Sequence, residues 1–309
     1  MAKATSRTRG RILSRLTVAA LAAALVGTTA GAAQAGETPK PHGSIAGAQN
    51  GIQGNAAAPQ KSRAAAPRAV LQPLLGVTGD NLYVYDPDWK GGYQAGRFGN
   101  DTWGGMKAAT QTNHTADGIA NSAWAVTTDG DLYHLEQDHN LRVGGGWNIY
   151  NRIFSPGNLA GAQGYDLLAR DGEGVLWLYL GYENGDVTKR YKVGGGWGQY
   201  TQITGLGDIT ADGTPDIVAR DSSGTLWLYE GTGVTAAPLK ARVKVGGGWN
   251  TYNTLVGTGD LDGDDITDLV ARGTDGSLWR YSGTGNAKAP YKARVKIGTS
   301  GWNKYRLLF

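Results

Sequence analysis

The aspartate-rich stretch near the C-terminus, Asp260-Leu-Asp-Gly-Asp-Asp-Ile-Thr-Asp268, has the residue types and the spacing of a metal site. Its first, third, fifth and ninth positions are carboxylates: Asp260, Asp262, Asp264 and Asp268. Four such charges brought together without a cation would repel and raise one another's pKa values. Calcium prefers oxygen ligands, and alternate aspartates around a glycine turn are typical of calcium loops. The stretch therefore predicts a Ca²⁺ site, with the carbonyl of Ile266 as the backbone ligand.

An earlier loop carries a weaker version of the same pattern. Its candidate ligands, in the same order, are Asp208, Thr210, Asp212, Thr214 and Asp216. The threonine at the third position offers a neutral oxygen in place of a carboxylate, which weakens the predicted site. A still earlier copy, residues 158–166, clearly keeps only Asp166. The alternative for these loops is an Asp/Gly turn whose charges are solvated.

A tryptophan that opens each repeated unit is a candidate ligand contact. The five are Trp103, Trp147, Trp197, Trp249 and Trp302. Most of them follow a glycine-rich turn, and glycines let backbone groups approach a ligand closely. A sugar ring stacks on a flat aromatic face that has polar groups nearby. The sequence thus offers these tryptophans as sugar contacts, with packing that closes a blade as the alternative.

Two further sets of residues recur at strands. Arg170, Arg220 and Arg272 each follow a strand directly, and a guanidinium could donate to ligand oxygens or to a carboxylate. An acid follows two of these arginines, so a local salt bridge or turn is the alternative. The second set lies in mid-strand, where alternate side chains point to opposite faces. We predict that its members pack between blades: Trp177, Trp227 and Trp279.

These residues belong to a unit that recurs about every 50 residues. Its aliphatic-aromatic strand occurs at 82–85, 132–135, 176–179, 226–229 and 278–281. Each unit has room for four short strands between Gly- or Asp-rich turns. In the unit after Trp249 we expect them at 252–256, 267–272, 277–282 and from 294 onward. No stretch after the N-terminal leader has a convincing helical periodicity. The fold class is predicted to be all-β.

The two ends of the repeated region are out of phase. The chain enters at the middle of a unit, near Leu75, and leaves on residues 302–309, which match the first strand after each tryptophan. Pairing the two ends completes a fifth unit and removes two exposed sheet edges. A solenoid would instead need polar caps at both ends. We predict a five-bladed β-propeller over residues 71–309, with one blade shared by the N- and C-terminal strands.

The preceding residues predict export. Residues 1–35 carry five basic residues and no acid, an apolar run from Leu16 to Val26, and the small residues of Ala33-Gln-Ala35. This is the pattern of a secretory signal peptide, and the run is too short for a membrane anchor. Residues 36–70 are rich in Ala, Gly, Pro and Gln, and we predict a disordered linker. The protein is thus expected to be secreted and extracellular, with no membrane span.

Charge and cysteine content exclude other classes. The whole chain is +4, so removing the five basic residues of 1–35 leaves −1. Residues 36–70 hold +3, which leaves −4 for residues 71–309. The propeller region therefore has no basic footprint for nucleic acid. The absence of cysteine excludes disulfides, thiol catalysis and Cys-ligated zinc.

Catalysis finds little support in the sequence. A glycosidase needs two unequal carboxylates facing one cleft, whereas these aspartates are equivalent from repeat to repeat. The Gly-Gly-Gly turns lead into tryptophan and not into a helix, so they are not phosphate-binding loops. We expect that the protein is not an enzyme.

The run Gly259-Asp-Leu-Asp-Gly-Asp-Asp-Ile-Thr-Asp-Leu-Val-Ala-Arg272, followed by Gly276-Ser-Leu-Trp279, resembles the FG-GAP/VCBS repeat. It is most similar to the variety in secreted actinobacterial (Streptomyces-like) proteins, strongly over about 142–309 and only weakly over 71–141. The resemblance implies propellers with calcium in the Asp loops and adhesive or ligand-binding roles, often beside secreted hydrolases. Some related small propellers are lectins with one sugar per blade. This chain departs from the pattern in having no catalytic domain and in carrying Asp265 where the loop usually has Gly.

Two functions remain open at this point. The first is a secreted, calcium-stabilised lectin that binds cell-wall or cell-surface glycans through several weak sites, because near-equal repeated sites give avidity. The second is a protein-interaction or targeting subunit of a secreted assembly, or an adhesin that binds no sugar. An enzyme on the central funnel is the weakest hypothesis, since no catalytic set is visible.

Overall fold

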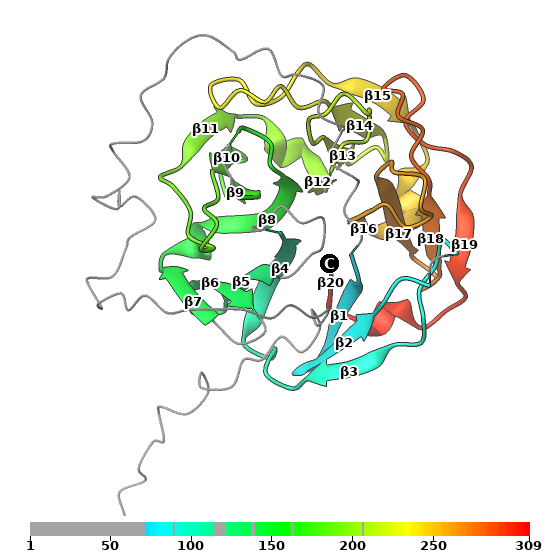
Figure 1. The fold of residues 1–309 in the computed structure, drawn as a ribbon, viewed down its shortest axis with the longest axis horizontal. Coiled ribbons are helices and arrows are strands. Elements are labelled where there is room, and N and C mark those ends of the chain that lie inside the picture. The colour runs from blue at the N-terminus through cyan, green and yellow to red at the C-terminus, as the bar shows by residue number, and fades with distance from the viewer. Residues whose placement is uncertain (1–71, 89, 114–121, 137–139, 162–163, 206) are drawn as a thin grey trace, which may run out of the picture.

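The computed structural model describes residues 72–309 except 89, 114–121, 137–139, 162–163 and 206. The predicted signal peptide (1–35) and linker (36–70) lie outside the described residues. Five four-stranded antiparallel sheets stand around a central axis (Figure 1) and form a five-bladed β-propeller. The predicted fold class and blade number are confirmed. Within the described part of the chain, no helix has the length and apolar character needed to span a membrane.

We number the blades in chain order and give the strands of each from the axis outward. The first blade contains β20 (Leu307–Leu308), β1 (Leu74–Thr78), β2 (Asn81–Tyr85) and β3 (Arg97–Asn100). The second contains β4 (Met106–Thr112), β5 (Ser122–Thr127), β6 (Leu132–Glu136) and β7 (Asn140–Gly144). The third contains β8 (Tyr150–Gly157), β9 (Asp166–Asp171), β10 (Leu176–Tyr179) and β11 (Tyr191–Gly194). The fourth contains β12 (Tyr200–Gly205), β13 (Ile217–Asp221), β14 (Leu226–Tyr229) and β15 (Val243–Gly246). The fifth contains β16 (Tyr252–Gly259), β17 (Asp268–Gly273), β18 (Leu278–Tyr281) and β19 (Val295–Gly298).

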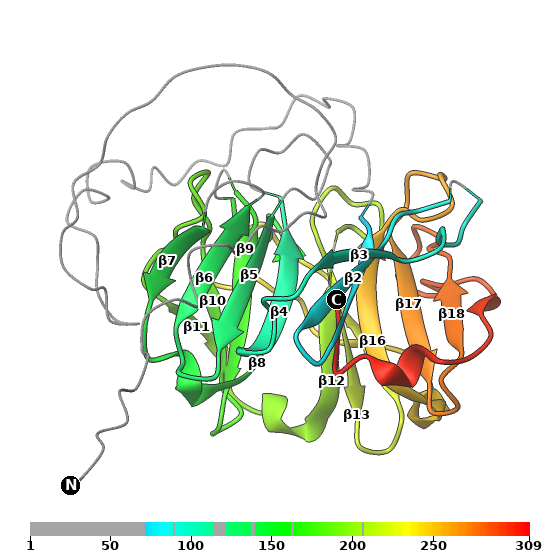
Figure 2. The same cartoon turned by 90° about the horizontal axis from the view of Figure 1, so that it is seen from below.

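Short 3-10 helices precede the inner strands. They are η2 (Trp147–Ile149), η3 (Trp197–Gln199), η4 (Trp249–Thr251) and η5 (Trp302–Lys304). Each begins after a glycine in the left-handed region, at φ between 81° and 86°. Only glycine adopts this conformation without strain, which explains the glycine before each of these tryptophans. The 3-10 helices lie at one end of the blades, and the loops that end the inner strands lie at the other (Figure 2).

The first blade closes the ring, as the phase of the two ends predicts. In its register Gly76 faces Leu308 and Val77 faces Leu307. The closure continues beyond these pairs, since Leu75 and Phe309 exchange both backbone hydrogen bonds, at 2.7 and 3.0 Å. Figure 1 shows β20 at the centre of the ring beside β1. The pairing removes the inner edge that β1 would otherwise expose.

The core lies between the blades because each sheet packs on both faces. In β14, Leu226 and Leu228 are fully buried, whereas Trp227 and Tyr229 are partly buried. Trp227 packs against a cluster that joins the third and fourth blades. Trp177 and Trp279 pack in the same way at neighbouring interfaces. The predicted inter-blade position of these three tryptophans is confirmed.

Candidate functional site

The loop between β16 and β17 gathers three of the predicted calcium ligands. One carboxylate oxygen from each of Asp260, Asp262 and Asp268 lies within 4.8 Å of the others. Asp260 and Asp268 are buried, and Asp262 Oδ1 is a buried oxygen that accepts no hydrogen bond. Burial raises the pKa of Asp268 to about 7, against the opposing effect of the Gly283 N–H group. These carboxylates fit a hard divalent cation such as Ca²⁺, which takes oxygen ligands.

The fourth predicted carboxylate is turned to another partner. Asp264 Oδ2 forms an ion pair with Lys292 Nζ at 2.8 Å, and Asp264 Oδ1 accepts a hydrogen bond from the Ile266 N–H group. A second cation, Arg280, lies 3.2 Å from Asp262 Oδ2. Lys292 and Arg280 therefore offset part of the negative charge of the loop. That negative charge is the basis on which the sequence predicts a metal ion.

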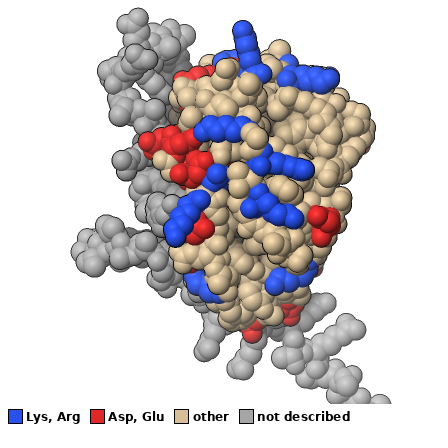
Figure 3. Space-filling model, turned by 90° about the vertical axis from the view of Figure 1, so that its right-hand side faces the viewer, with Lys and Arg blue, Asp and Glu red and all other residues tan. Residues whose placement is uncertain are grey.

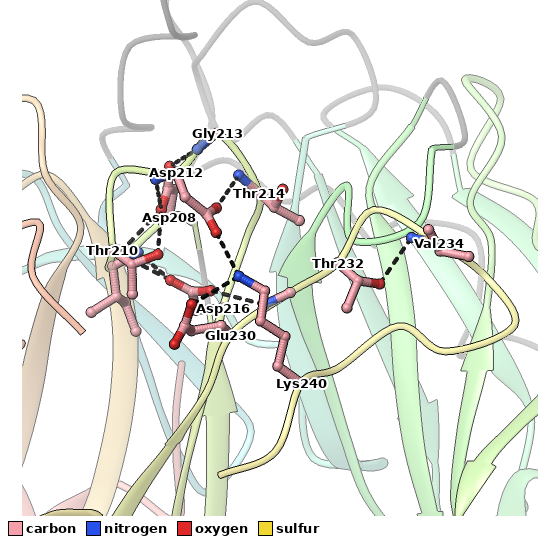
Figure 4. Close-up of polar contacts among 12 residues, drawn as sticks. Asp208, Thr210, Asp212, Gly213, Thr214, Asp216, Glu230, Thr232, Val234 and Lys240 are labelled. Carbon is pink, nitrogen blue, oxygen red and sulfur yellow. Dashed lines mark hydrogen bonds and ion pairs between the residues drawn. The ribbon is translucent and has the colours of Figure 1, made fainter. Parts of the chain in front are cut away.

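The equivalent loop between β12 and β13 does not bring three carboxylates as close together. Asp208 accepts hydrogen bonds from the N–H groups of Thr210, Asp212 and Gly213 (Figure 4). Asp212 pairs with Lys240 at 3.1 Å and accepts a further bond from the Thr214 N–H group. In the part of the chain that the structure describes, three ligating side chains gather only in the later loop. The carboxylates of Asp208 and Asp212 accept hydrogen bonds from the backbone of their own loop. Calcium binding by Asp208, Thr210, Asp212, Thr214 and Asp216 stays a prediction.

The aspartate at the ninth position of each loop ties the loop to the third strand of its blade. Asp166 accepts hydrogen bonds from the N–H groups of Ala160 and Gly181, at 2.9 and 3.2 Å. Asp216 and Asp268 make the corresponding pairs of bonds in their blades. Burial raises the pKa of each of the three to about 7. Because Asp166 keeps this role in a loop without other acids, the ninth position is structural as well as a possible ligand.

Both Asp loops place a residue other than glycine in the left-handed region. Asp265 has φ 65°, where the earlier loop has Gly213 at φ 89°. Ala211 has φ 58°, where the later loop has Gly263 at φ 81°. Each loop thus needs two left-handed positions and provides glycine at only one of them. A side chain at the other position is strained.

Aromatic side chains cover the turn tryptophans: tyrosines in four cases, and Phe309 in the case of Trp103. Trp103, Trp147, Trp197 and Trp249 are at most 6% exposed, and Trp302 is partly buried. The ring centroid of Trp197 lies 4.7 Å from that of Tyr229 and 5.5 Å from that of Tyr200. Equivalent stacks surround Trp147, Trp249 and Trp302. Because other side chains occupy their faces, the prediction that a sugar stacks on these rings needs correction: the rings close the blades.

The recurring arginines bind backbone carbonyls of the next blade. Arg170 Nη1 donates to the carbonyls of Trp197 and Tyr200, at 3.1 and 2.6 Å. Arg220 makes the same bonds to the next 3-10 helix, as does Arg272. We call this arrangement the arginine clamp. The predicted ligand contact of Arg170, Arg220 and Arg272 is therefore corrected to a structural bond between blades, and not to a local salt bridge.

Arg306 supplies a clamp that sequence analysis missed. It donates to the carbonyls of Trp103 and Met106 in the second blade. Unlike the other three arginines, Arg306 precedes the inner strand of its blade, so it does not occupy the repeated position after the second strand. Its only sequence signal is a place directly before β20. The interface between the second and third blades has no arginine at this position, and there Lys107 Nζ binds Asn148 Oδ1 at 3.2 Å.

A pocket of about 240 Å³ lies between the third and fourth blades. Its walls include Gly194–Gly196, the buried Trp197, and the phenols of Tyr200 and Tyr229, which are hydrogen bonded to each other. Lys240 also lines the pocket. The sequence predicted the tryptophan and the glycines, but it missed the phenol pair. The signal was present, because a tyrosine follows three residues after four of the five turn tryptophans.

Comparison with known proteins supports the repeat. Residues 208–271 match the profile of the FG-GAP-like repeat. No curated protein matches the chain. Among solved structures, the chain is similar to BBS1N, crystallised in complex with ARL6DN, with 11% identity and a TM-score of 0.41 over 72% of this chain and 63% of that chain. It therefore spans less than two thirds of that protein. It is also similar to a triple arginine-to-alanine mutant of AofleA from Arthrobotrys oligospora, with 10% identity and a TM-score of 0.44 over 75% of this chain and 73% of that chain. The chain is a five-bladed β-propeller that contains an FG-GAP-like repeat.

Proposed function

We propose that this protein is a secreted carbohydrate-binding propeller whose ligand occupies the pocket beside Trp197. The observation that carries the proposal is a pocket between two blades with both polar and apolar walls, whose aromatic residues recur around the ring. The Trp197–Tyr200–Tyr229 arrangement returns as Trp147–Tyr150–Tyr179 and as Trp249–Tyr252–Tyr281. Repeated sites of similar geometry suit a polymer with repeated units, because several weak contacts add up to avidity.

The size and chemistry of the pocket favour a small polyhydroxylated ligand. Its volume of about 240 Å³ is below the roughly 300–1,000 Å³ typical of sites for drug-sized ligands. A single sugar ring is a ligand of the appropriate size. Tyr200 and Tyr229 provide hydroxyl groups, Lys240 provides a donor, and Gln199 provides both a donor and an acceptor. The edge of Trp197 adds an apolar contact in place of the stacked face that the sequence predicted.

Calcium belongs to the same proposal as a stabilising ion. The residues that would hold it are Asp260, Asp262 and Asp268, because their carboxylates converge and Asp262 retains a buried oxygen without a hydrogen bond. The ion would cross-link the loop to β17 and offset the repulsion among the three acids. Its role here is to stabilise the fold and not to catalyse a reaction.

Calorimetric titration with N-acetylglucosamine and its oligomers tests sugar binding. We expect saturable binding at more than one site per chain, with the oligomers binding more tightly than the monosaccharide. Gly195→Leu should remove the site beside Trp197, because a Cβ at Gly195 meets no atom within 4 Å and the longer side chain would fill the pocket. Gly172→Leu is the matched control, since its Cβ also meets open space at a turn outside the pocket. Absence of heat at millimolar sugar from folded protein would refute the proposal.

A protein partner is the second candidate, and the charge of the outer strands favours it. At the start of β19, the outer strand of the fifth blade, Arg294 and Lys296 are exposed on either side of Val295, which is 47% exposed. Figure 3 shows Lys and Arg side chains spread over this side of the molecule. An acidic partner with an apolar contact would fit this strand. Co-purification of a secreted partner that sugars do not displace, and that Arg294→Glu releases, would support this candidate.

A further inference from the structure

The cavity on the propeller axis is lined by cations but by no acidic side chain. It has a volume of about 380 Å³ and is enclosed by the five inner strands. Its cationic residues are Lys107, Arg152, Arg272 and Arg306. Its other polar residues are amides and hydroxyls, such as Gln202 and Thr204. Within the described residues, none of the four cations forms an ion pair with a carboxylate.

Arg152 has the least compensated charge of the four. It lies in β8 directly opposite Arg170 in β9, and like charges in facing positions of a sheet repel each other. Burial, together with the charge of Arg170, lowers the pKa of Arg152 to about 10. A guanidinium that is buried opposite a second arginine needs an anion or water to stabilise its charged form.

The hydrogen bonds of Arg152 leave most of its donors available. Its guanidinium donates from Nε to the carbonyl of Ile203, at 3.0 Å, and makes no other hydrogen bond to the described residues. Since a guanidinium has five N–H donors, four remain for another acceptor. Gln202, which lines the same cavity, has a buried Oε1 atom without a hydrogen-bond partner. The donors of Arg272, in contrast, are used by the arginine clamp and by side chains of β16.

The blade structure does not require an arginine at this position. At the same place in the register of the other blades, Gln202 faces Arg220, Thr254 faces Arg272 and Ala108 faces Val126. In these three blades a neutral residue occupies the position, so the blade folds without an arginine there. Asp80 acts electrostatically on Arg306. The terminal carboxyl group of Phe309, which also lines the cavity, forms no ion pair with any of the four cations.

We propose that the axial cavity binds a small organic anion, with its carboxylate or phosphate group on Arg152. Two oxygens of such a group match the planar fork of a guanidinium. The rest of the ligand would contact the amides and hydroxyls of the inner strands. This site is separate from the pocket beside Trp197. The axial site selects ligands that carry a negative charge, whereas the pocket beside Trp197 binds a neutral sugar ring.

Calorimetric titration with inorganic phosphate, glucuronate and glucose at constant ionic strength tests the proposal. We expect one axial site per chain for at least one of the two anions. Arg152→Gln should weaken that binding at least tenfold, and it should fold because glutamine occupies the same position in β12. Glucose is the neutral counterpart of glucuronate, so any binding of glucose should be unaffected by Arg152→Gln, and Gly195→Leu should remove only the part of it that belongs to the site beside Trp197. Binding of phosphate indicates that the anionic group alone suffices, and binding of glucuronate alone indicates that the organic part is also required.

A second axial variant and a control variant complete the test. Gln202→Glu places a carboxylate beside Arg152, which should compete with the ligand and also weaken binding at least tenfold. Arg97→Gln is the control, because it removes an exposed arginine that pairs with Asp86 far from the axis. The proposal is overturned if neither anion binds the wild-type protein, or if both axial variants bind as tightly as the wild type does.

Discussion

Asp262 tests whether calcium stabilises the loop. Its Oδ1 atom makes no hydrogen bond within the described residues, whereas its Oδ2 atom pairs with Arg280 at 3.2 Å and accepts a hydrogen bond from Ser282. Replacing the carboxylate with an amide therefore removes a metal ligand and also leaves the charge of Arg280 uncompensated. We predict that Asp262→Asn abolishes most of the increase in melting temperature that calcium gives, and that its melting temperature in chelator also falls below that of the wild type. Thermal unfolding by circular dichroism in calcium and in chelator measures both values.

Asp260 is the matched comparison in the same loop. It accepts hydrogen bonds from the N–H groups of Gly263, Asp264 and Asp265, so Asp260→Ala should lower the melting temperature with and without calcium. If calcium leaves the melting temperature of the wild type unchanged, the loop is an Asp/Gly turn and the metal proposal fails.

Asp265 offers a gain of stability from one substitution. Its left-handed φ of 65° strains a residue with a Cβ, and glycine relieves that strain. The greater freedom of glycine in the unfolded chain offsets part of the gain. We predict that Asp265→Gly stabilises the fold by about 0.5–1 kcal/mol, or roughly 1–4 °C in melting temperature. Gly213→Asp, at the same place in the earlier loop, should destabilise, and the two changes can be compared by urea unfolding.

The buried aspartates at the ninth loop position predict how stability depends on pH. The pKa of Asp166 rises from 3.8 to about 7 on folding, so the folded state holds its proton more tightly than the unfolded state does. The stability from this group is fully present below about pH 4 and is lost as the pH rises through 7. We predict that the melting temperature in chelator falls by several degrees between pH 5 and pH 8, and that it falls less in Asp166→Asn. A melting temperature that rises over this interval would contradict the assignment.

The arginine clamp belongs to the scale of elements, since it joins the second strand of one blade to the 3-10 helix of the next. Arg220 is 7% exposed and binds the carbonyls of Trp249 and Tyr252. Arg220→Met leaves both carbonyls without this donor, and we predict a loss of about 2–4 kcal/mol in the free energy of unfolding. Arg97→Gln, which removes an exposed ion pair, should cost less than about 1 kcal/mol. Urea denaturation of both variants gives the comparison, and equal losses would show that the clamp adds nothing beyond a surface pair.

The sequence predicted the strands better than it predicted the contacts between them. In the fifth blade the predicted strands at 252–256, 267–272 and 277–282 correspond to β16, β17 and β18, because alternation and turn residues are local signals. The role of Arg170 was not predictable in this way, because its partners are backbone carbonyls of a neighbouring blade and any residue type provides a carbonyl. For Trp197 the sequence left blade packing as the alternative to sugar contact, but it did not identify the tyrosines that cover the ring.

At the scale of the whole molecule, the ring closure was predictable because residues 302–309 carry the pattern of a first strand without the rest of a unit. The anionic preference of the axial cavity was not. It depends on Arg152, which breaks the repeat, and on the absence of acidic side chains from a wall that five separate strands compose. Repeats predict what the blades share, whereas a site at their common axis depends on where they differ.

Removal of residues 306–309 tests how much the closed ring stabilises the whole fold. The truncation deletes β20, the clamp of Arg306 and the side chain of Phe309, which packs in the core against Trp103. Truncating one buried aromatic side chain alone costs about 3–5 kcal/mol. We predict a fall of at least about 10 °C in melting temperature, since roughly 2–4 °C corresponds to 1 kcal/mol at this size. Val295→Ser, on the exposed outer strand, is the control and should leave the melting temperature unchanged. A truncated protein that melts with the wild type would mean that the ring is held by its other interfaces alone.

The pairing of β1 with β20 can form only after the whole chain has been synthesised. At about 5–20 residues per second, roughly ten to fifty seconds separate the emergence of these two strands from the ribosome. During that interval β1 can pair with β2, but its axial edge has no native neighbour. The first blade to be synthesised is therefore the last to be completed. Until β20 is made, the unpaired edge of β1 can pair with a strand of another chain.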